Sequence, residues 1–277
     1  MTPESEALIC AQASEAAYGT AESCRAAMAA LGLVDFAWVD LTTTFEEVCA
    51  FVASGSDVHL LAFRGTKSFR DWMTDLACTP VRFDWVFTGA PVLGEIHAGF
   101  GHCLADGLND IEAALVKRDP AKPLLITGHS LGGALAALAG AYFTVAGKSV
   151  PAISRIYTFG QPRIGLHSFC NTYSRILAGR LIRFVNRHDI VPRVPLRGFD
   201  YGDEGTMIHF DSSGTPMIQS PEWRSFLARA FQSLDDVIRE VENLGVDIGE
   251  HSVSGYRELV NNTQPQLGVL LHDACRD

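Results

Sequence analysis

Pro123-Leu-Leu-Ile-Thr-Gly-His-Ser-Leu-Gly-Gly-Ala134 is the stretch of sequence that decides the fold of this chain. Its apolar run, Leu124 to Thr127, predicts a buried strand of a parallel sheet. The Ala- and Leu-rich residues from Ala134 to Phe143 predict a helix that packs on that sheet. Between them lies Gly128-His-Ser-Leu-Gly132, a Gly-x-Ser-x-Gly pattern at the corner where a strand turns into a helix.

Such a corner strains the backbone of Ser130 and pushes its hydroxyl out above the sheet. Gly128 and Gly132 flank the serine because strand and helix approach too closely there for a Cβ atom. The helix N-terminus also directs free backbone N–H groups toward any negative charge that develops beside Ser130. The pattern therefore predicts a nucleophilic serine, and a Gly-rich turn around a buried structural serine is the alternative hypothesis.

Length and composition are those of a globular α/β protein. The chain has 277 residues, of which 47% are hydrophobic and 19% are charged, and its net charge is −10. We expect one domain over residues 1–277, since we find no internal repeat, linker or low-complexity segment. The negative charge argues against nucleic acid and anionic membrane surfaces as partners, and we see no apolar run of transmembrane length.

The N-terminus and the cysteines bear on the compartment of the protein. Met1 to Glu6 is acidic and lacks the basic and apolar regions of a signal peptide. The seven cysteines, at positions 10, 24, 49, 78, 103, 170 and 275, are scattered and never closely paired. Free thiols in a reducing compartment, without a zinc site, are the simplest interpretation. We therefore expect a cytoplasmic protein, and a secreted protein whose signal has been removed is the alternative.

Strands and helices alternate around the central corner, which predicts a mostly parallel sheet covered by helices on both faces. An early hairpin turn at 54–57 makes that sheet mixed. We expect strands at 34–41, 48–53, 58–63, 95–98, 153–159 and 181–185, and helices at 4–17, 21–31, 99–117, 167–177 and 221–243. We also expect a hairpin over 199–211, turning at 203–205, and a last helix near Tyr256.

A short amphipathic segment follows the loop at Gly65. Its apolar residues Phe69, Trp72, Met73 and Leu76 recur at helical spacing, so they form one face of a helix. A helix of the core is the common interpretation of this pattern. Because the segment lies between a loop and a Gly/Pro-rich connection, a mobile flap is the alternative.

A serine hydroxyl is a poor nucleophile at neutral pH, so it needs a base, and the base needs an orienting acid. On sheets of this type the order along the chain is Ser, then Asp or Glu, then His. Asp189 suits the acid, because it follows the strand predicted at 181–185. The downstream histidines are His167, His188, His209, His251 and His272. His251 lies in a loop after Asp189, whereas His167 and His188 precede it, His209 lies in a strand pattern, and His272 lies near the end of the chain.

Six groups of residues resemble the class 3 lipase family, the fungal triacylglycerol lipases and their relatives, in the family's order over roughly residues 45–260. They are Phe63-Arg-Gly-Thr66, Ile96-His-Ala-Gly-Phe100, Gly128-His-Ser-Leu-Gly132, Tyr157-Thr-Phe-Gly-Gln-Pro-Arg-Ile-Gly165, Val185-Asn-Arg-His-Asp-Ile-Val-Pro192, and His251 with Tyr256. The resemblance implies an α/β-hydrolase fold.

The resemblance also implies roles for residues. Ser130 is then the nucleophile, Asp189 the acid and His251 the base. The backbone N–H groups of Thr66 and Leu131 form the oxyanion hole. Residues 68–79 match the lid, so that Phe69, Trp72, Met73 and Leu76 contact substrate.

The function implied is hydrolysis of carboxylic esters, with triacylglycerol lipase as the leading hypothesis and an ester or lipid, at a lipid–water interface, as the substrate. An esterase of soluble esters such as a feruloyl esterase, a phospholipase A1 and a non-catalytic interaction protein on this fold are the alternatives. The chemistry needs no cofactor and no metal. Asp200, Asp203 and Glu204 suggest calcium weakly, and we expect a solvated turn there. The sequence leaves the oligomeric state open.

Overall fold

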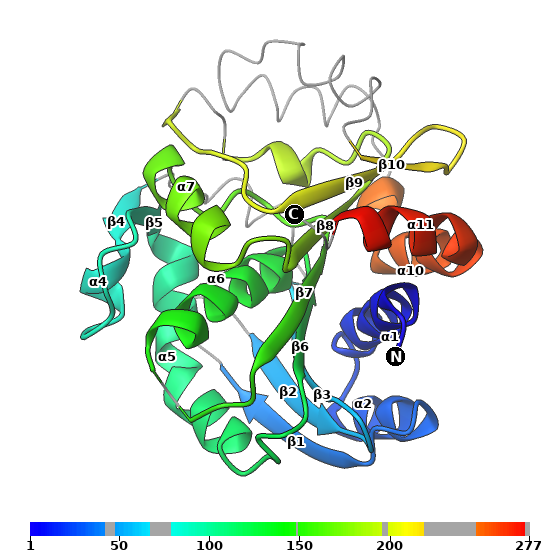
Figure 1. The fold of residues 1–277 in the computed structure, drawn as a ribbon, viewed down its shortest axis with the longest axis horizontal. Helices are drawn as coiled ribbons and strands as arrows, with labels where there is room; N and C mark the ends of the chain where they lie inside the picture. The colour runs from blue at the N-terminus through cyan, green and yellow to red at the C-terminus, as the bar shows by residue number, and fades with distance from the viewer. Residues whose placement is uncertain (42–47, 67–78, 148, 196–198, 219–247, 275–277) are drawn as a thin grey trace.

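A computed structural model of the chain describes residues 1–41, 48–66, 79–147, 149–195, 199–218 and 248–274 (Figure 1). These residues form an eight-stranded sheet in the order β1-β2-β3-β6-β7-β8-β9-β10. Its strands are β1 (Asp35–Asp40), β2 (Cys49–Ser54), β3 (His59–Phe63), β6 (Leu124–His129), β7 (Ile153–Phe159), β8 (Leu181–Asn186), β9 (Thr206–Phe210) and β10 (Pro216–Ile218). A second sheet pairs β4 (Pro80–Arg82) with β5 (Glu95–His97).

The large sheet is mixed, as the sequence predicted. Its centre is parallel, since β3, β6, β7, β8 and β9 all pair in the same direction. Antiparallel pairs close it at both ends, because β1 and β2 precede β3 as hairpin neighbours and β10 folds back on β9. The turn predicted at 54–57 is the link between β2 and β3.

Helices cover both faces of this sheet (Figure 1). On one face lie α5 (Ala98–Leu115), α6 (Leu131–Val145) and α7 (His167–Ile176). On the other lie α1 (Pro3–Ala16), α2 (Ala21–Ala30), α10 (Val253–Asn262) and α11 (Gln264–Ala274). A one-turn helix, α4 (Phe83–Val86), stands beside the small sheet.

The central strands are apolar on both sides because both sides are covered. Along β3, Leu61 and Phe63 belong to the core under α5 and α6, whereas Leu60 and Ala62 belong to the core under α1 and α2. All four side chains are fully buried. Alternate residues of a strand point to opposite faces, so a strand buried on both faces loses the apolar–polar alternation of a surface strand. None of the described helices combines the length and apolar character needed to cross a bilayer.

The corner between β6 and α6 contains a single residue. Strand β6 ends at His129 and helix α6 begins at Leu131, so Ser130 alone makes the turn. Its backbone has φ 59° and ψ −128°, a conformation that an L-residue adopts only under strain. A Cβ at Gly128 would clash with the carbonyl of Gly132, and one at Gly132 would clash with the carbonyl of Phe63. The two glycines therefore let α6 start directly against the sheet.

Several expectations were wrong or incomplete. The hairpin predicted over 199–211 does not form, because β9 joins the sheet parallel to β8 and its antiparallel partner is β10. The turn signal at Asp203 and Glu204 belongs instead to a loop whose carboxylates face arginines, as shown below. The sequence also missed α4 and α11. The helix expected at 221–243 and the segment 68–78 lie outside the described residues.

We predict that Gly128→Ala lowers the free energy of unfolding by about 3 kcal/mol or more, because the new Cβ overlaps the backbone of α6. Urea unfolding measures this loss. Gly268→Ala in α11 is the matched control: its Cβ makes only ordinary contacts, the nearest at 3.4 Å to Glu4. That change should raise stability by about 0.5–1 kcal/mol, as Gly to Ala does in a helix interior. Equal effects at the two positions would contradict this account of the corner.

Candidate active site

Three side chains from distant parts of the chain form one chain of hydrogen bonds. Nε2 of His251 lies 2.9 Å from Oγ of Ser130, and Nδ1 of His251 lies 2.8 Å from Oδ2 of Asp189. All three residues are buried. A carboxylate only accepts hydrogen bonds, so Nδ1 carries the proton and Nε2 is left with a lone pair toward the serine hydroxyl. The sequence predicted these three residues, and the structure brings them together.

Both carboxylate oxygens of Asp189 are held in place. Oδ1 accepts from the backbone N–H of Val191 at 2.9 Å, at the start of the 3-10 turn η1 (Val191–Arg193). Oδ2 accepts from the hydroxyl of Tyr256 at 2.6 Å in addition to His251. The backbone N–H of Asp189 donates to the carbonyl of Asn186, the last residue of β8, at 2.8 Å. The carboxylate therefore has a fixed orientation at the carboxyl end of the sheet.

Tyr256 ties the histidine segment to the aspartate. It stands in α10, which begins just after η3 (Ile248–His251), and the side chain of Ser252 caps this helix by accepting from Gly255 N–H at 3.0 Å. Besides donating to Asp189, its hydroxyl accepts from the backbone N–H of Asn186 at 3.0 Å. Burial and the charge of Asp189 raise the pKa of Tyr256, so the hydroxyl keeps the proton that it donates.

Gly160 leaves the space that the histidine ring occupies. It follows β7 with φ +58°, and a Cβ there would lie 2.8 Å from Cε1 of His251 and 2.9 Å from Oδ2 of Asp189. Both approaches are shorter than real Cβ contacts, so a larger residue would displace the pair. The sequence missed this role, although Gly160 lies within the stretch 157–165.

Thr66 and Leu131 both lie at the carboxyl edge of the sheet beside Ser130. Phe63 and Gly128 are paired at the ends of β3 and β6, so the loops after these strands run side by side. A Cβ at Gly65 would lie 3.3 Å from the Cβ of Ser130, which places the residue before Thr66 against the serine. Leu131 opens α6, where the first N–H groups of a helix have no partner inside it. The loop that carries Thr66 and the start of α6 therefore both lie next to Ser130.

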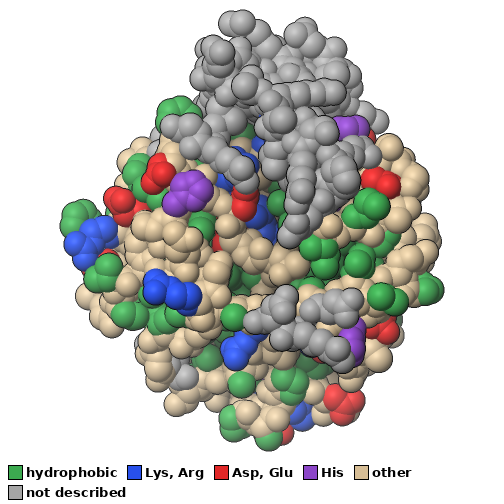
Figure 2. All heavy atoms as spheres, turned by 45° about the horizontal axis from the view of Figure 1, so that its top comes forward, with side chains coloured by type: hydrophobic (Ala, Val, Ile, Leu, Met, Phe, Trp, Pro, Cys, Tyr) green, Lys and Arg blue, Asp and Glu red, His purple; other side chains and the backbone are tan. Residues whose placement is uncertain are grey.

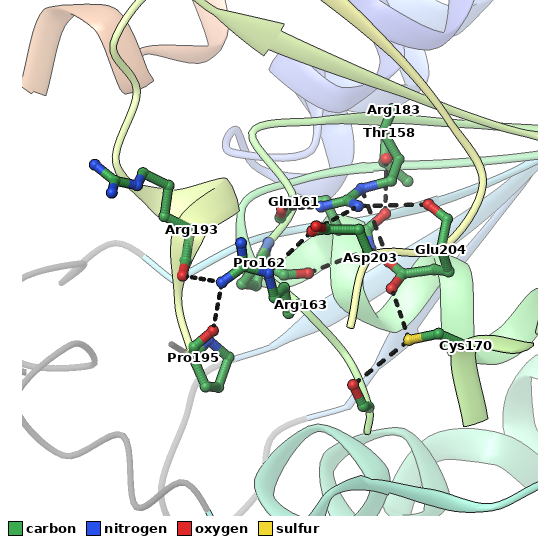
Figure 3. A network of polar contacts seen from close by, with 11 residues as sticks. Thr158, Gln161, Pro162, Arg163, Cys170, Arg183, Arg193, Pro195, Asp203 and Glu204 are labelled. Carbon is green, nitrogen blue, oxygen red and sulfur yellow. Dashed lines mark hydrogen bonds and ion pairs between the residues drawn. The ribbon is translucent and has the colours of Figure 1, made fainter. Parts of the chain in front are cut away.

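Arg163 braces the segment that follows Asp189 (Figure 3). Its Nη1 donates to the carbonyls of Arg193 and of Pro195, the latter at 2.8 Å. Its backbone N–H donates to the carbonyl of Val194 at 2.8 Å, and its Nε donates to Asp203 at 2.9 Å. One buried guanidinium therefore joins the loop after β7 to the loop that carries Asp189.

Asp203 and Glu204 are partners of arginines rather than residues of a solvated turn, so that expectation was wrong. Glu204 is 1% exposed, and its carboxylate lies 3.8 Å from Nε of the buried Arg183. Gln161 donates to the same carboxylate, and the thiol of Cys170 lies 3.5 Å from its other oxygen (Figure 3). Burial raises the pKa of Glu204, against the pull of the Arg183 guanidinium.

The other candidate histidines lie elsewhere. His167, His188 and His272 are exposed, and His209 lies in β9, where its Nε2 donates to the carbonyl of Arg187 at 2.7 Å. Within the described residues, His251 is the histidine downstream of the serine that forms a hydrogen bond with Ser130. The expected lid residues Phe69, Trp72, Met73 and Leu76 lie outside the described residues.

The fold defines the chain as an α/β hydrolase, with a nucleophile corner and a Ser–His–Asp arrangement at the carboxyl end of a mostly parallel sheet. The model of the lipase (class 3) family matches residues 60–199, half of the chain. The protein belongs to the class 3 lipase family, as the sequence predicted.

Individual relatives agree with this assignment. A lipase of Rhizomucor miehei is 34% identical over 168 residues, which cover 58% of this chain and 44% of that protein. Lipase II of Rhizopus niveus is similar in structure, with a TM-score of 0.61 and 25% identity over 76% of this chain and 81% of that one. A triacylglycerol lipase whose catalytic centre is a serine protease triad has a TM-score of 0.66 and 25% identity over 84% of this chain and 91% of that one. The matched part spans less than half the length of the first curated relative.

His129, the residue before Ser130, is a buried histidine that sequence reasoning did not single out. Burial and the neighbouring His251 hold its pKa well below the ordinary value. Because the unfolded chain binds a proton there below about pH 6.5 and the folded protein does not, acid favours unfolding.

We predict that His129 alone removes about 1.4 kcal/mol of stability between about pH 7.5 and 5.5. Urea unfolding of the wild type and of His129→Gln at both values isolates this contribution. The stability difference between the two proteins should shift by that amount in favour of the variant at the lower pH. A difference that stays constant with pH would contradict a neutral buried His129.

We predict that Arg163→Met lowers the free energy of unfolding by about 3–5 kcal/mol, because two carbonyls and Asp203 lose a buried donor. Chemical unfolding measures the change. Arg175→Met is the matched control, since Arg175 is exposed and its Nη2 donates to the hydroxyl of Thr172 in its own helix at 3.3 Å. A loss below about 1 kcal/mol for Arg163→Met would show that the hydrogen bonds of the Arg163 guanidinium contribute little to stability.

Proposed function

We propose that this protein is a serine carboxylic ester hydrolase that acts as a lipase on acylglycerols. The observation that carries the proposal is the unbroken relay from Ser130 through His251 to Asp189, at 2.9 and 2.8 Å, on a strained corner. A serine hydroxyl becomes a nucleophile when a positioned base can take its proton, and this geometry supplies the base and its orienting acid.

In the proposed mechanism His251 accepts the proton of Ser130 at Nε2 while Oγ attacks the ester carbonyl. The imidazolium that results is stabilised by Asp189, whose two oxygens are already held by Val191 and Tyr256. This prior orientation means that the acid need not reorganise when the charge appears. The relay therefore lowers the barrier to forming the tetrahedral intermediate.

The oxyanion of that intermediate is bound by the backbone N–H groups of Thr66 and Leu131. The N-terminus of α6 adds its partial positive charge at the same point. Collapse of the intermediate breaks the ester C–O bond, and His251 gives its proton to the departing alcohol. Water then attacks the acyl-serine with His251 again as the base, which releases the fatty acid and restores Ser130.

The lipid preference rests on the relatives and on the segment 68–79. The relatives named above are lipases, and one is a triacylglycerol lipase. We propose that Phe69, Trp72, Met73 and Leu76 present an apolar face to the substrate as a lid. An esterase of soluble esters would share the relay and differ in this segment, so the two functions separate by their response to a lipid interface.

The compartment is proposed from the thiols. Among the described cysteines, Cys10, Cys24 and Cys170 are free and buried. Burial raises the pKa of Cys24 to about 11, so its thiol stays protonated. A reducing compartment such as the cytoplasm fits these thiols.

The face shown in Figure 2 intersperses acidic, basic and apolar side chains over the described surface.

We predict that the rate of tributyrin hydrolysis rises sharply once the substrate exceeds its solubility and forms droplets. Ser130→Ala should lower the rate by about 10⁶-fold, because the relay acts as a unit. Titration of the released acid at constant pH measures both. Ser154→Ala is the matched control. This half-buried serine lies near the start of β7, its hydroxyl donates to the carbonyl of Leu124, and the variant should keep full activity.

The same assay distinguishes the alternative functions. Saturation below the solubility limit would replace the lipase by an esterase of soluble esters. Normal turnover in Ser130→Ala would overturn the assignment of the nucleophile. Absence of hydrolysis of both forms of the substrate by the wild-type protein would overturn the proposed function as a whole.

A further inference from the structure

A second line of hydrogen bonds reaches the active site from the N-terminal part of the chain, for which the sequence suggested no role. Tyr18 stands two residues after the end of α1, and its hydroxyl lies 2.8 Å from Nδ1 of His129. On the far side of the same ring, Nε2 of His129 lies 2.7 Å from the backbone carbonyl of His251. The imidazole of His129 therefore bridges Tyr18 to the histidine of the proposed relay.

The chemistry of the three groups fixes the direction of both bonds. A carbonyl oxygen only accepts, so Nε2 of His129 carries a proton and donates to His251. The depressed pKa of His129 keeps the ring neutral, which leaves Nδ1 as an acceptor. Tyr18 must then be the donor to Nδ1. The carbonyl of His251 and the hydroxyl of Tyr18 thus favour the same tautomer of His129, the one with its proton on Nε2.

Packing leaves the bridge little freedom. The rings of His129 and His251 have centroids 4.6 Å apart, and that of Tyr18 lies 5.8 Å from His129 with the two planes at 62°. His129 is 4% exposed, so water does not replace its partners. If the donor to Nδ1 were removed, this buried nitrogen would be left without a partner, and the tautomer with its proton on Nε2 would lose part of its stabilisation.

Tyr18 also touches the loop proposed to bind the oxyanion. A Cβ at Gly65 would clash with the Tyr18 hydroxyl and would lie 2.7 Å from the carbonyl oxygen of His129. Burial raises the pKa of Tyr18, against the pull of the Arg64 charge, so the hydroxyl keeps the proton that it donates. One hydroxyl therefore joins the loop before Thr66 to the corner at Ser130.

We propose that Tyr18 is a positioning residue of the active site, which holds His129 in the tautomer whose Nε2–H anchors the backbone of His251. The proposal rests on the proposed function, because it assigns His251 the role of base. The hydrogen bond to the carbonyl of His251 restricts the backbone of this residue. Its imidazole ring therefore keeps Nε2 directed toward Ser130. Tyr18 acts through His129 and does not itself meet the substrate.

Tyr18→Phe tests the proposal, since it removes the hydroxyl and keeps the ring. We expect kcat on a soluble p-nitrophenyl ester to fall about tenfold, the effect of one lost hydrogen bond, with KM changed less than about twofold. Nitrogen-15 NMR of the His129 ring should show the Nε2–H tautomer in the wild type and a mixture of tautomers in the variant. If Tyr18 were purely structural, Tyr18→Phe would leave the tautomer of His129 unchanged and would not lower kcat selectively relative to KM.

Tyr142→Phe is the matched control. Its hydroxyl donates to Glu112 at 2.8 Å between α6 and α5, on the other face of the sheet. It should lower the melting temperature as Tyr18→Phe does, without changing kcat or the His129 spectrum. In a His129→Gln background, Tyr18→Phe should lower kcat by less than about twofold, because the two residues act in series.

The outcomes separate the two proposals. Wild-type kcat and an unchanged His129 spectrum in Tyr18→Phe, in a protein whose activity depends on Ser130, would overturn the positioning role alone. Full additivity of the Tyr18 and His129 substitutions would also overturn it, since Tyr18 would then act by another path. A wild-type protein without Ser130-dependent hydrolysis would overturn the proposed function and this inference together.

Discussion

The active site depends on how closely β6, β3 and α6 approach one another at the corner. No Cβ fits at Gly128 or Gly132, and the turn between strand and helix is left to Ser130 alone. This closeness forces the serine into a strained backbone conformation and directs the first N–H groups of α6 past its hydroxyl. Strain at such a position persists only because the packed sheet around it over-determines the backbone. The packed core thus holds Ser130 in this conformation.

Around that corner, polar side chains form hydrogen bonds with other groups of the protein. Asp189 is oriented by Tyr256 and Val191, and the loop that carries it is braced by Arg163. His251 is held through its ring by Asp189 and through its carbonyl by His129. Buried polar groups are costly when unpaired and rigid when fully paired, so this arrangement fixes the geometry before substrate arrives. The three loops at the carboxyl edge therefore behave as one bonded unit.

Much of the fold followed from local signals, whereas the supporting contacts did not. The corner was predictable because its glycines and its serine act within five residues, and the chain order predicted that Asp189 and His251 would meet Ser130. The resemblance to class 3 lipases pointed to Tyr256. Tyr18 could not be found, because its partner lies 111 residues away and only the packing of α1 on the sheet brings them together. The residues around Glu204 were predicted to form a solvated turn for a similar reason, because their arginine partners come from other loops and strands.

The central claim is that Ser130 is the nucleophile of an ester hydrolase, and covalent labelling tests it most directly. The protein is incubated with an alkyl fluorophosphonate, which forms a stable adduct only with a serine activated by a neighbouring base, and the labelled residue is identified by peptide mass spectrometry. The account predicts one adduct per chain, on the peptide that carries Ser130, and no adduct in His251→Ala. An adduct on another residue, or none on Ser130 in the folded wild-type protein, would contradict it.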